Sequence, residues 1–383
     1  MRTVLVTGPG GAGTSTVAAA TALAAAHAGA RTLLITADPP PGLSAPGTPG
    51  LTVRTVDSAG VFQDRAADLQ ERLSTVFDLL GASPLDTEEF TELPGSREFA
   101  LLHALGAADG HDLVVADLPP VRGAIGLLAL PEQLRRYLAR LLPPERQAAR
   151  ALRPMLAQLA GVPMPAERLY DMAARWDTEL AAVQAVIDSA ATTVRLVVEP
   201  GPRTADRIRT ARTGLALFGH RLESVTANRL LPTGSADPFL AGLSGQQQEH
   251  LKALYEEFAA DGVPVRELPH LGRDPYGPDD LAALGGQDAH AEPLPATPAG
   301  EPWSVEDRLA ADGQLVWRLP LPGATRDTLD LVRRGDEVVV DAAGFRRIMP
   351  LPSALRRCTV TGAALRDGVL EVRFAPDPAL WPR

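Results

Sequence analysis

The segment that most constrains the fold is a glycine-rich loop between an apolar run and an alanine-rich run near the start of the chain. The apolar run ends at Val6, the loop reads GPGGAGTST over residues 8–16, and the alanines follow Val17. These three compositions favour a buried strand, a tight loop and a helix. Glycines at such a junction let successive backbone N–H groups point at one anion beside the helix N-terminus. The segment therefore predicts a strand–loop–helix unit with a phosphate-binding nest.

Apolar runs and stretches of helical periodicity alternate along most of the chain. The runs that we expect to form strands are residues 2–7, 31–36, 111–120, 192–200, 223–232 and 263–271. The expected helices include residues 16–28, 62–80 and 203–218. This alternation predicts an α/β fold, a mostly parallel sheet with helices on both faces, and ligands bind such sheets at the carboxyl ends of their strands. The polar residues expected at those ends are Asp38, Asp117, Glu199 and Asn228.

The pattern also predicts two domains. Residues 1–285 form the α/β domain, with a helical insertion over approximately 60–100 and 126–190 that is rich in Leu, Met and Ala. The segment 286–302 is polar and rich in Pro and Ala, so we expect a linker. Residues 303–383 are expected to form the second domain.

Short runs in which apolar and polar residues alternate dominate this second domain. The expected strands are residues 314–321, 337–343, 345–351 and 368–374. Asp367-Gly368 has the composition of a hairpin turn. Because no helical period is present, these runs predict a small antiparallel β-sandwich.

Composition excludes several classes of protein. A net charge of -10 and a pI near 5.3 argue against a general binder of nucleic acid or of an anionic membrane, which needs a basic face. Cys358 is the only cysteine, so one chain has neither a disulfide framework nor a cysteine-ligated metal or metalloid site. No apolar run approaches the roughly 20 residues of a membrane span, and no signal peptide is recognisable. We therefore expect a cytoplasmic protein without an integral membrane segment.

Five segments together resemble the ArsA family, which includes arsenical-pump ATPases and ATPases that target tail-anchored proteins. The family loop G-K-G-G-V-G-K-[ST]-T is similar to GPGGAGTST, and the family segment [ST]-x-D-P-A is similar to TADPP. The matching segments are residues 8–16, 36–40, 93–105, 111–132 and 226–232. Residues 335–352 and 361–374 look like the α-crystallin-like domain that some members append. The resemblance covers nearly the whole chain in the family's order.

The resemblance implies a P-loop NTPase fold of the deviant Walker A type with an ATP site. Its nucleotide-binding residues would be Gly10, Gly11, Ala12, Gly13, Thr14, Ser15, Thr16, Glu199 and Asn228. Ser15 would hold Mg²⁺, while Asp38 and Asp117 would orient the attacking water and a magnesium-bound water. Asn228 would contact adenine. The alternative is that both aspartates are relics that only end strands, and that Glu199 and Asn228 satisfy nearby backbone groups.

The loop departs from the family pattern at both of its lysines. Thr14 replaces the P-loop lysine, and Pro9 replaces the lysine that reaches the phosphates of the partner subunit. A charge-assisted contact is worth about 1.5–3 kcal/mol, and a cation on the transferring phosphoryl group contributes on the order of 10³–10⁵ in rate. We therefore expect ATP, ADP and Mg²⁺ to bind weakly and hydrolysis to be very weak or absent. Arg122 could supply a replacement cation, and a solvent-facing arginine is the alternative.

In active members of the family, helices beside the nucleotide site enclose a groove for a hydrophobic client. The residues expected to line it here are Leu134, Leu138, Met155, Leu159, Met164 and Met172. Flexible methionines suit variable apolar partners, although filling core gaps between helices is the alternative. The family's zinc clasp and metalloid site both need cysteine, so no zinc or metalloid cofactor is expected. The family's composite site implies a homodimer, or a heterodimer with a lysine-bearing paralogue.

These expectations leave three functions open. The first is a degenerate ATPase that acts, with or without nucleotide, as a chaperone-like or scaffold protein for an apolar client or partner. The second is a slow Mg²⁺-ATPase that uses Arg122 or a cation of the partner subunit. The third is a cleft that now binds another small molecule or serves as an interface.

Overall fold

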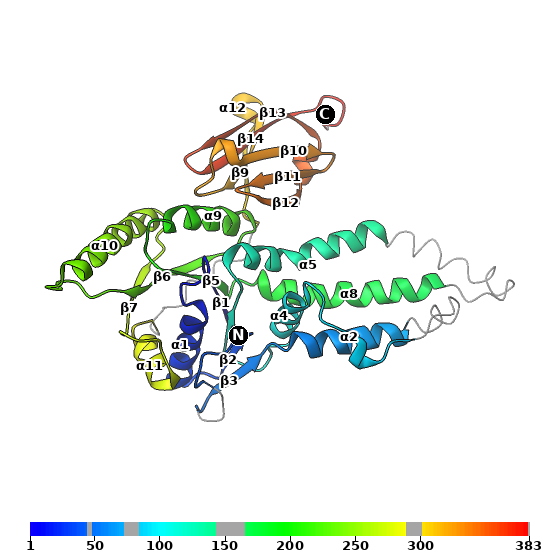
Figure 1. The fold of residues 1–383 in the computed structure, drawn as a ribbon. Helices are drawn as coiled ribbons and strands as arrows, with labels where there is room; N and C mark the ends of the chain where they lie inside the picture. The colour runs from blue at the N-terminus through cyan, green and yellow to red at the C-terminus, as the bar shows by residue number, and fades with distance from the viewer. Residues whose placement is uncertain (44–47, 73–83, 143–164, 289–300, 382–383) are drawn as a thin grey trace.

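The first domain is built on a parallel sheet of seven strands in the order β3-β2-β4-β1-β5-β6-β7 (Figure 1). The computed structural model describes residues 1–43, 48–72, 84–142, 165–288 and 301–381. The strands are β1 (Arg2–Thr7), β2 (Thr32–Thr36), β3 (Leu51–Thr55), β4 (Leu113–Asp117), β5 (Thr192–Val198), β6 (Leu222–Leu230) and β7 (Val265–Pro269). All six expected strands are present. The sequence did not predict β3, because this edge strand is only partly buried and lacks a continuous apolar run.

Helices cover both faces of this sheet, as predicted. They are α1 (Thr14–His27), α2 (Ser58–Arg72), α4 (Ser96–Gly106), α5 (Val121–Leu141), α8 (Pro165–Ile187), α9 (Thr204–Leu217), α10 (Pro238–Ala259) and α11 (Gly277–Asp288), with a 3₁₀ turn η1 (Thr87–Glu89). Val4 and Val6 pack with α1 and α11, whereas Leu5 belongs to the larger core on the other face. Side chains alternate between faces along a strand, so one apolar run serves two cores.

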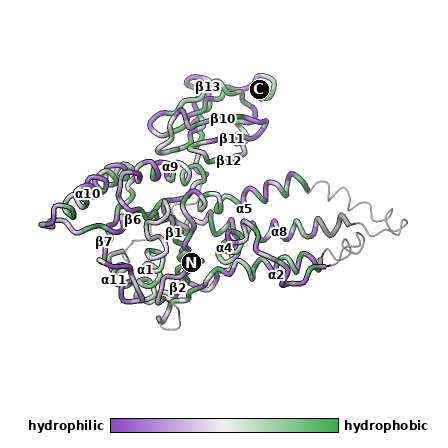
Figure 2. Tube along the Cα trace, viewed as in Figure 1, coloured by the Kyte–Doolittle hydropathy of each residue, from purple (hydrophilic) through white to green (hydrophobic). Residues whose placement is uncertain are grey.

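The helical insertion forms an arm beside the sheet, in which α2 packs on α4 and α5 packs on α8 (Figure 1). The buried residues of α5 all lie between Val121 and Pro131. This inner half of the helix is coloured hydrophobic, whereas the outer half carries hydrophilic residues (Figure 2). Among the described residues, no helix has both the length and the apolar character needed to cross a bilayer.

The second domain has two antiparallel sheets, in the orders β10-β11-β12 and β13-β14-β9-β8. Its elements are β8 (Ser304–Arg308), α12 (Leu309–Asp312), β9 (Gln314–Pro320), η2 (Arg326–Thr328), β10 (Leu329–Arg334), β11 (Glu337–Ala342), β12 (Phe345–Pro350), α13 (Ser353–Arg356), β13 (Cys358–Arg366) and β14 (Val369–Pro376). All four expected strands are present, and β8, β10 and β13 were not predicted. Asp367 and Gly368 have φ of 49° and 70° and turn β13 into β14.

The second domain rests on α9 and on α5 (Figure 1). A Cβ atom at Gly214 of α9 would lie 2.6 Å from the Phe345 ring and 2.7 Å from Ile125, so only glycine allows this close approach. Arg136 of α5 donates two hydrogen bonds to Glu337 of β11, at 3.1 and 2.9 Å. The α11 helix ends at Asp288, inside the segment that the sequence predicts as a linker, and residues 289–300 lie outside the described residues.

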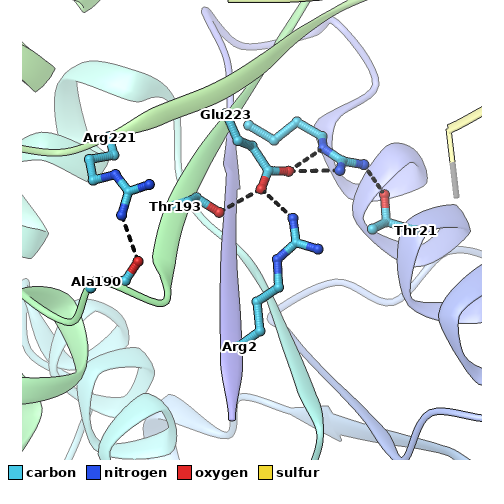
Figure 3. Close-up of polar contacts among 7 residues, drawn as sticks. Arg2, Thr21, Ala190, Thr193, Arg221 and Glu223 are labelled. Carbon is cyan, nitrogen blue, oxygen red and sulfur yellow. Dashed lines mark hydrogen bonds and ion pairs between the residues drawn. The ribbon is translucent and has the colours of Figure 1, made fainter. Parts of the chain in front are cut away.

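A buried charged network connects three strands with α1 (Figure 3). Arg195 of β5 donates to Glu223 of β6 at 2.7 Å and to Thr21 of α1 at 2.9 Å. Arg2 and Thr193 donate to the other carboxylate oxygen, at 2.8 and 2.5 Å. Arg195 and Glu223 are 1% and 4% exposed, so both charges are paired inside the protein. Burial alone would raise the pKa of Glu223, but Arg195, Thr193 and Arg2 together hold it below its ordinary value.

Candidate functional site

The glycine-rich loop between β1 and α1 has a backbone that only glycine adopts readily. Gly10, Gly11 and Gly13 have φ of 92°, 77° and 84°, in the left-handed region where a side chain is strained. Gly8 is required for a different reason, because a Cβ atom there would lie 2.1 Å from the Val197 carbonyl oxygen. The sequence therefore places its glycines where the fold needs a tight, open turn.

The loop leads directly into the N-terminus of α1. The helix begins at Thr14, and its N-cap residue Gly13 provides no side-chain cap. The first N–H groups of a helix have no acceptor within the helix, and they carry the positive end of its dipole. A backbone of this geometry over residues 10–16 is of the kind that can bind an anion, and it does not depend on a lysine.

Asp117 lies beside the loop at the carboxyl end of β4. Thr36 donates a hydrogen bond to its carboxylate at 2.8 Å, and the Ser15 hydroxyl lies near enough to lower the pKa of the same carboxylate. Burial raises the pKa of Asp117 above its ordinary value, and these two hydroxyls act in the opposite direction. The predicted magnesium residue and the predicted catalytic aspartate therefore lie near each other. An oxygen set of a serine hydroxyl and a nearby carboxylate suits Mg²⁺, which binds few protein oxygens and keeps several waters.

Asp38, the other predicted catalytic aspartate, points into solvent at the same edge of the sheet. Its side chain is 84% exposed and forms an ion pair with Arg97 of α4 at 2.5 Å. Both charges act on Asp117 through space, which places them close to the site. Arg97 was not predicted as a site residue, although it lies inside the family-like segment 93–105. The resemblance of this segment to the family was the sequence signal that could have identified Arg97.

Asn228 and Glu199 also lie at this edge, but their contacts differ from the expected ones. The Asn228 amide is buried and donates to the Ala12 carbonyl oxygen at 2.8 Å. Glu199 forms an ion pair with Arg229 at 3.2 Å, and Arg229 donates to the Gly11 carbonyl oxygen at 2.9 Å. The hydrogen bonds from Asn228 and Arg229 hold the glycine-rich loop against the end of β6. Sequence reasoning missed Arg229, although it follows Asn228 in the family-like segment 226–232.

Arg122 contacts the second domain instead of the loop. Its guanidinium lies 5.1 Å from the centre of the Phe345 ring, and Nη2 donates to the Ala343 carbonyl oxygen at 3.5 Å. The side chain is exposed and belongs to the first turn of α5, not to a loop. The start of α5 does reach the glycine-rich loop, because Val121 donates its N–H to the Gly8 carbonyl oxygen at 2.8 Å. The role of Arg122 as a replacement cation stays a prediction.

The predicted client groove is described only in part. Leu134 and Leu138 of α5 and Met172 of α8 are half-buried on helices that pack against each other. Met155, Leu159 and Met164 lie outside the described residues. The larger apolar exposure on this arm comes from other side chains, Leu141 at 75% and Trp176 at 43%.

Comparison with known proteins agrees with this fold. The anion-transporting ATPase family, ArsA, matches residues 1–287, which contain the sheet, the glycine-rich loop and the helical arm. The HSP20-like domain found in ArsA proteins matches residues 312–374, within the two antiparallel sheets.

Similar relatives cover the chain from end to end. A protein of Streptomyces coelicolor, named only as uncharacterised, is 56% identical over 100% of both chains. A protein of Mycobacterium tuberculosis is 32% identical over 100% of this chain and 97% of its own. A protein of Aquifex aeolicus, provisionally named arsenical pump-driving ATPase 1, is 25% identical over 93% of this chain and 95% of its own. The family matches and the full-length relatives lead to one conclusion: the chain belongs to the ArsA family of anion-transporting ATPases and carries that family's HSP20-like domain.

Proposed function

We propose that this protein binds a nucleotide weakly in the glycine-rich loop, hydrolyses it very slowly or not at all, and acts as a chaperone-like or scaffold protein in the cytoplasm. The observation that carries the proposal is the combination of an open backbone turn at Gly10, Gly11 and Gly13 with Ser15 and Asp117 beside it. These are the parts of the site that do not depend on lysine.

The residues present fit a magnesium nucleotide, with one deficit. The backbone N–H groups of residues 10–16 would hold the phosphates, and Ser15 with Asp117 would hold the cation and its waters. Bound Mg²⁺ would neutralise phosphate charge. The deficit is a positive charge, because the family pattern has a lysine where this chain has Thr14. The Thr14 hydroxyl is uncharged, and it would lie 3.2 Å from a Cβ atom built at Gly8.

Loss of the lysines affects hydrolysis more than binding. Binding can rest on the nest, because backbone donors and a helix dipole already favour an anion. Hydrolysis needs charge stabilisation that strengthens as the transition state forms, and preorganised cations supply most of it. With Thr14 and Pro9 at the two lysine positions, the chain lacks those cations in the loop itself. A dimer whose partner supplies a lysine, from a second gene product of the same family, would restore part of this loss.

The first test is calorimetric titration of Mg·ATP and Mg·ADP into the native protein, with a phosphate-release assay in parallel. Substituting Thr14→Lys should tighten binding by roughly 10- to 100-fold and raise turnover, since it adds one charge-assisted contact. Thr14→Val is the matched control and should do neither. No binding of either nucleotide at millimolar concentration would overturn the nucleotide part of the proposal, and native turnover as fast as that of Thr14→Lys would overturn the weak-hydrolysis part.

The client role has its own test on the helical arm. Leu141 is 75% exposed, so Leu141→Asp should not affect folding, yet it should weaken binding of an amphipathic apolar peptide to the arm. Phe239→Asp is the matched control, because Phe239 is 72% exposed on α10, away from the arm. Equal peptide binding by the native protein and both variants would contradict a client site on the arm. Light scattering of the native protein then tests the proposed dimer.

A further inference from the structure

Two consecutive residues of β6, Asn228 and Arg229, both contact the glycine-rich loop. Asn228 donates to the Ala12 carbonyl oxygen at 2.8 Å, and Arg229 Nη1 donates to the Gly11 carbonyl oxygen at 2.9 Å. Consecutive side chains of a regular strand point to opposite faces, so this arrangement needs a distortion. Arg229 provides it with a φ of 59°, and the pairing of β6 with β7 changes register at the same place. A bulge of this kind re-aims a side chain.

A buried side chain holds this distortion in place. Gln247 of α10 is 8% exposed, and its amide donates to the Arg229 carbonyl oxygen at 3.0 Å. The same amide accepts a hydrogen bond from the Leu231 N–H at 2.8 Å. A left-handed backbone is costly for a residue with a side chain, and it persists only where surrounding contacts enforce it. The fold therefore directs the Arg229 side chain to the loop.

The guanidinium of Arg229 retains capacity for a further ligand. Its contacts with Gly11 and with Glu199 both use Nη1, and arginine has five N–H donors. Within the part of the chain that the structure describes, Nε and Nη2 of Arg229 make no hydrogen bond. The ion pair with Glu199 is 3.2 Å long between side chains that are 43% and 49% exposed, and pairs this exposed are weak and exchange readily.

We propose that Arg229 is the cation of this phosphate site, in place of the missing loop lysine, and that Glu199 competes with the phosphate for it. This inference rests on the proposed function, because it names the residue that holds the phosphate in the same loop. In the ligand-free protein Arg229 bridges Gly11 and Glu199. When a diphosphate or triphosphate occupies the nest, the free donors of the guanidinium bind a phosphate oxygen and the Glu199 pair opens. A guanidinium suits this role because its planar donors match two phosphate oxygens.

The probe for this inference is inorganic pyrophosphate, titrated calorimetrically into the full-length protein, with Mg·ATP titrated in parallel. We expect Arg229→Gln to weaken pyrophosphate binding by about 10- to 100-fold and Arg229→Lys to keep most of it. Arg31→Gln is the matched control for net charge. Arg31 is paired with Asp112 at 2.8 Å at the opposite, amino-terminal edge of the sheet, and its loss should leave binding unchanged.

Competition by Glu199 is tested with a double-mutant cycle. Glu199→Gln should tighten pyrophosphate binding in the native background, since it releases Arg229. The gain should shrink in the Arg229→Gln background, whereas simple removal of a negative charge near the site predicts the same gain in both. A purely structural role of Arg229 predicts instead that Arg229→Gln and Arg229→Lys lower the melting temperature of the anion-free protein and weaken binding equally.

The outcomes separate this inference from the proposed function. Equal pyrophosphate binding by the native protein and Arg229→Gln overturns the role of Arg229, and Mg·ATP binding then leaves the proposed function intact. Pyrophosphate binding that depends on Arg229, without any binding of Mg·ATP, supports the role of Arg229 and overturns the nucleotide proposal. No pyrophosphate binding by the native protein at millimolar concentration overturns the inference, and the Mg·ATP titration decides the proposed function independently.

Discussion

The side-chain amide of Asn228 donates a hydrogen bond to the carbonyl oxygen of Ala12 at 2.8 Å, so the end of β6 holds the glycine-rich loop in place. The contact is buried, and a Cβ atom at Gly13 would lie 2.5 Å from the same amide nitrogen. Loop and strand end therefore fit together before any ligand binds. This changes the meaning of an experiment at Asn228, because its loss affects the loop as well as any contact with a base.

Asn228→Ala should destabilise the ligand-free protein by about 1–3 kcal/mol, because the Ala12 carbonyl group loses its buried partner. Urea denaturation measures this change. If Asn228 only braces the loop, the variant should weaken binding of pyrophosphate and of Mg·ATP by similar factors. A loss confined to Mg·ATP, with unchanged stability, would show instead that Asn228 contacts adenine.

Glu223→Gln should destabilise the protein by about 3–5 kcal/mol, since it removes the carboxylate that neutralises the buried charge of Arg195. Glu256→Gln is the control: its pair with Lys252 is 3.7 Å long between exposed side chains and should change stability by less than about 1 kcal/mol. Because the pKa of Glu223 is lowered in the folded state, its stabilisation is full above the unfolded pKa near 4.5 and is lost as pH falls through the folded pKa. Similar urea midpoints for the two variants would contradict this account.

His220 should make the protein sensitive to mild acid. Its Nε2 is buried without a hydrogen-bond partner within the described residues, and burial followed by the nearby Arg347 lowers its pKa from 6.5 to about 4. Only the unfolded chain then takes up a proton between these values, so stability should fall by up to about 3 kcal/mol as pH drops from 6.5 to 4. His220→Gln should flatten this part of the stability profile. An unchanged profile in that variant would exclude His220 as the cause.

Asp117 should destabilise the ligand-free fold at neutral pH. Burial raises its pKa, so folding disfavours the charged form, and stability falls as pH rises from the unfolded pKa through the folded one. Asp117→Asn removes this charge, and we expect it to be more stable than the native protein, with the difference growing as pH rises from the unfolded pKa through the folded one. Thermal melts across pH 4 to 8 test it. A difference that is constant with pH would point to packing or hydrogen bonding instead of charge.

Gly214→Ala should loosen the contact between the two domains. The new Cβ atom would meet the Phe345 ring at 2.6 Å, and overpacking of this kind costs about 1–3 kcal/mol. Gly126→Ala on α5 is the control, because no atom lies within 4 Å of its new Cβ, and it should be neutral or slightly stabilising. Limited proteolysis between the domains, together with thermal melts, measures the effect. Equal protease resistance of both variants would show that this contact does not hold the domains together.

Much of the fold was predictable because apolar runs indicate buried strands and glycines indicate backbone turns with positive φ. The runs at residues 2–7 and 192–200 had to be buried strands, and three glycines of the loop now have φ values that other residues adopt with strain. The partly buried strand β3 was not predicted, since its sequence LTVRT carries no continuous apolar signal. The positions of Asp38, Asp117, Glu199 and Asn228 at one edge followed from parallel strand order alone.

The amino-acid sequence by itself determined the α/β class and the glycine-rich loop without a lysine, because these depend on local composition and on the order of strands along the chain. Only the tertiary structure decided which side chains face the loop. Arg229 reaches Gly11 because a bulge and Gln247 turn it toward the loop, and Arg122 contacts Phe345 because the second domain packs over α9. Such contacts join residues far apart in the chain, and their direction depends on backbone distortions and domain packing that no local pattern records.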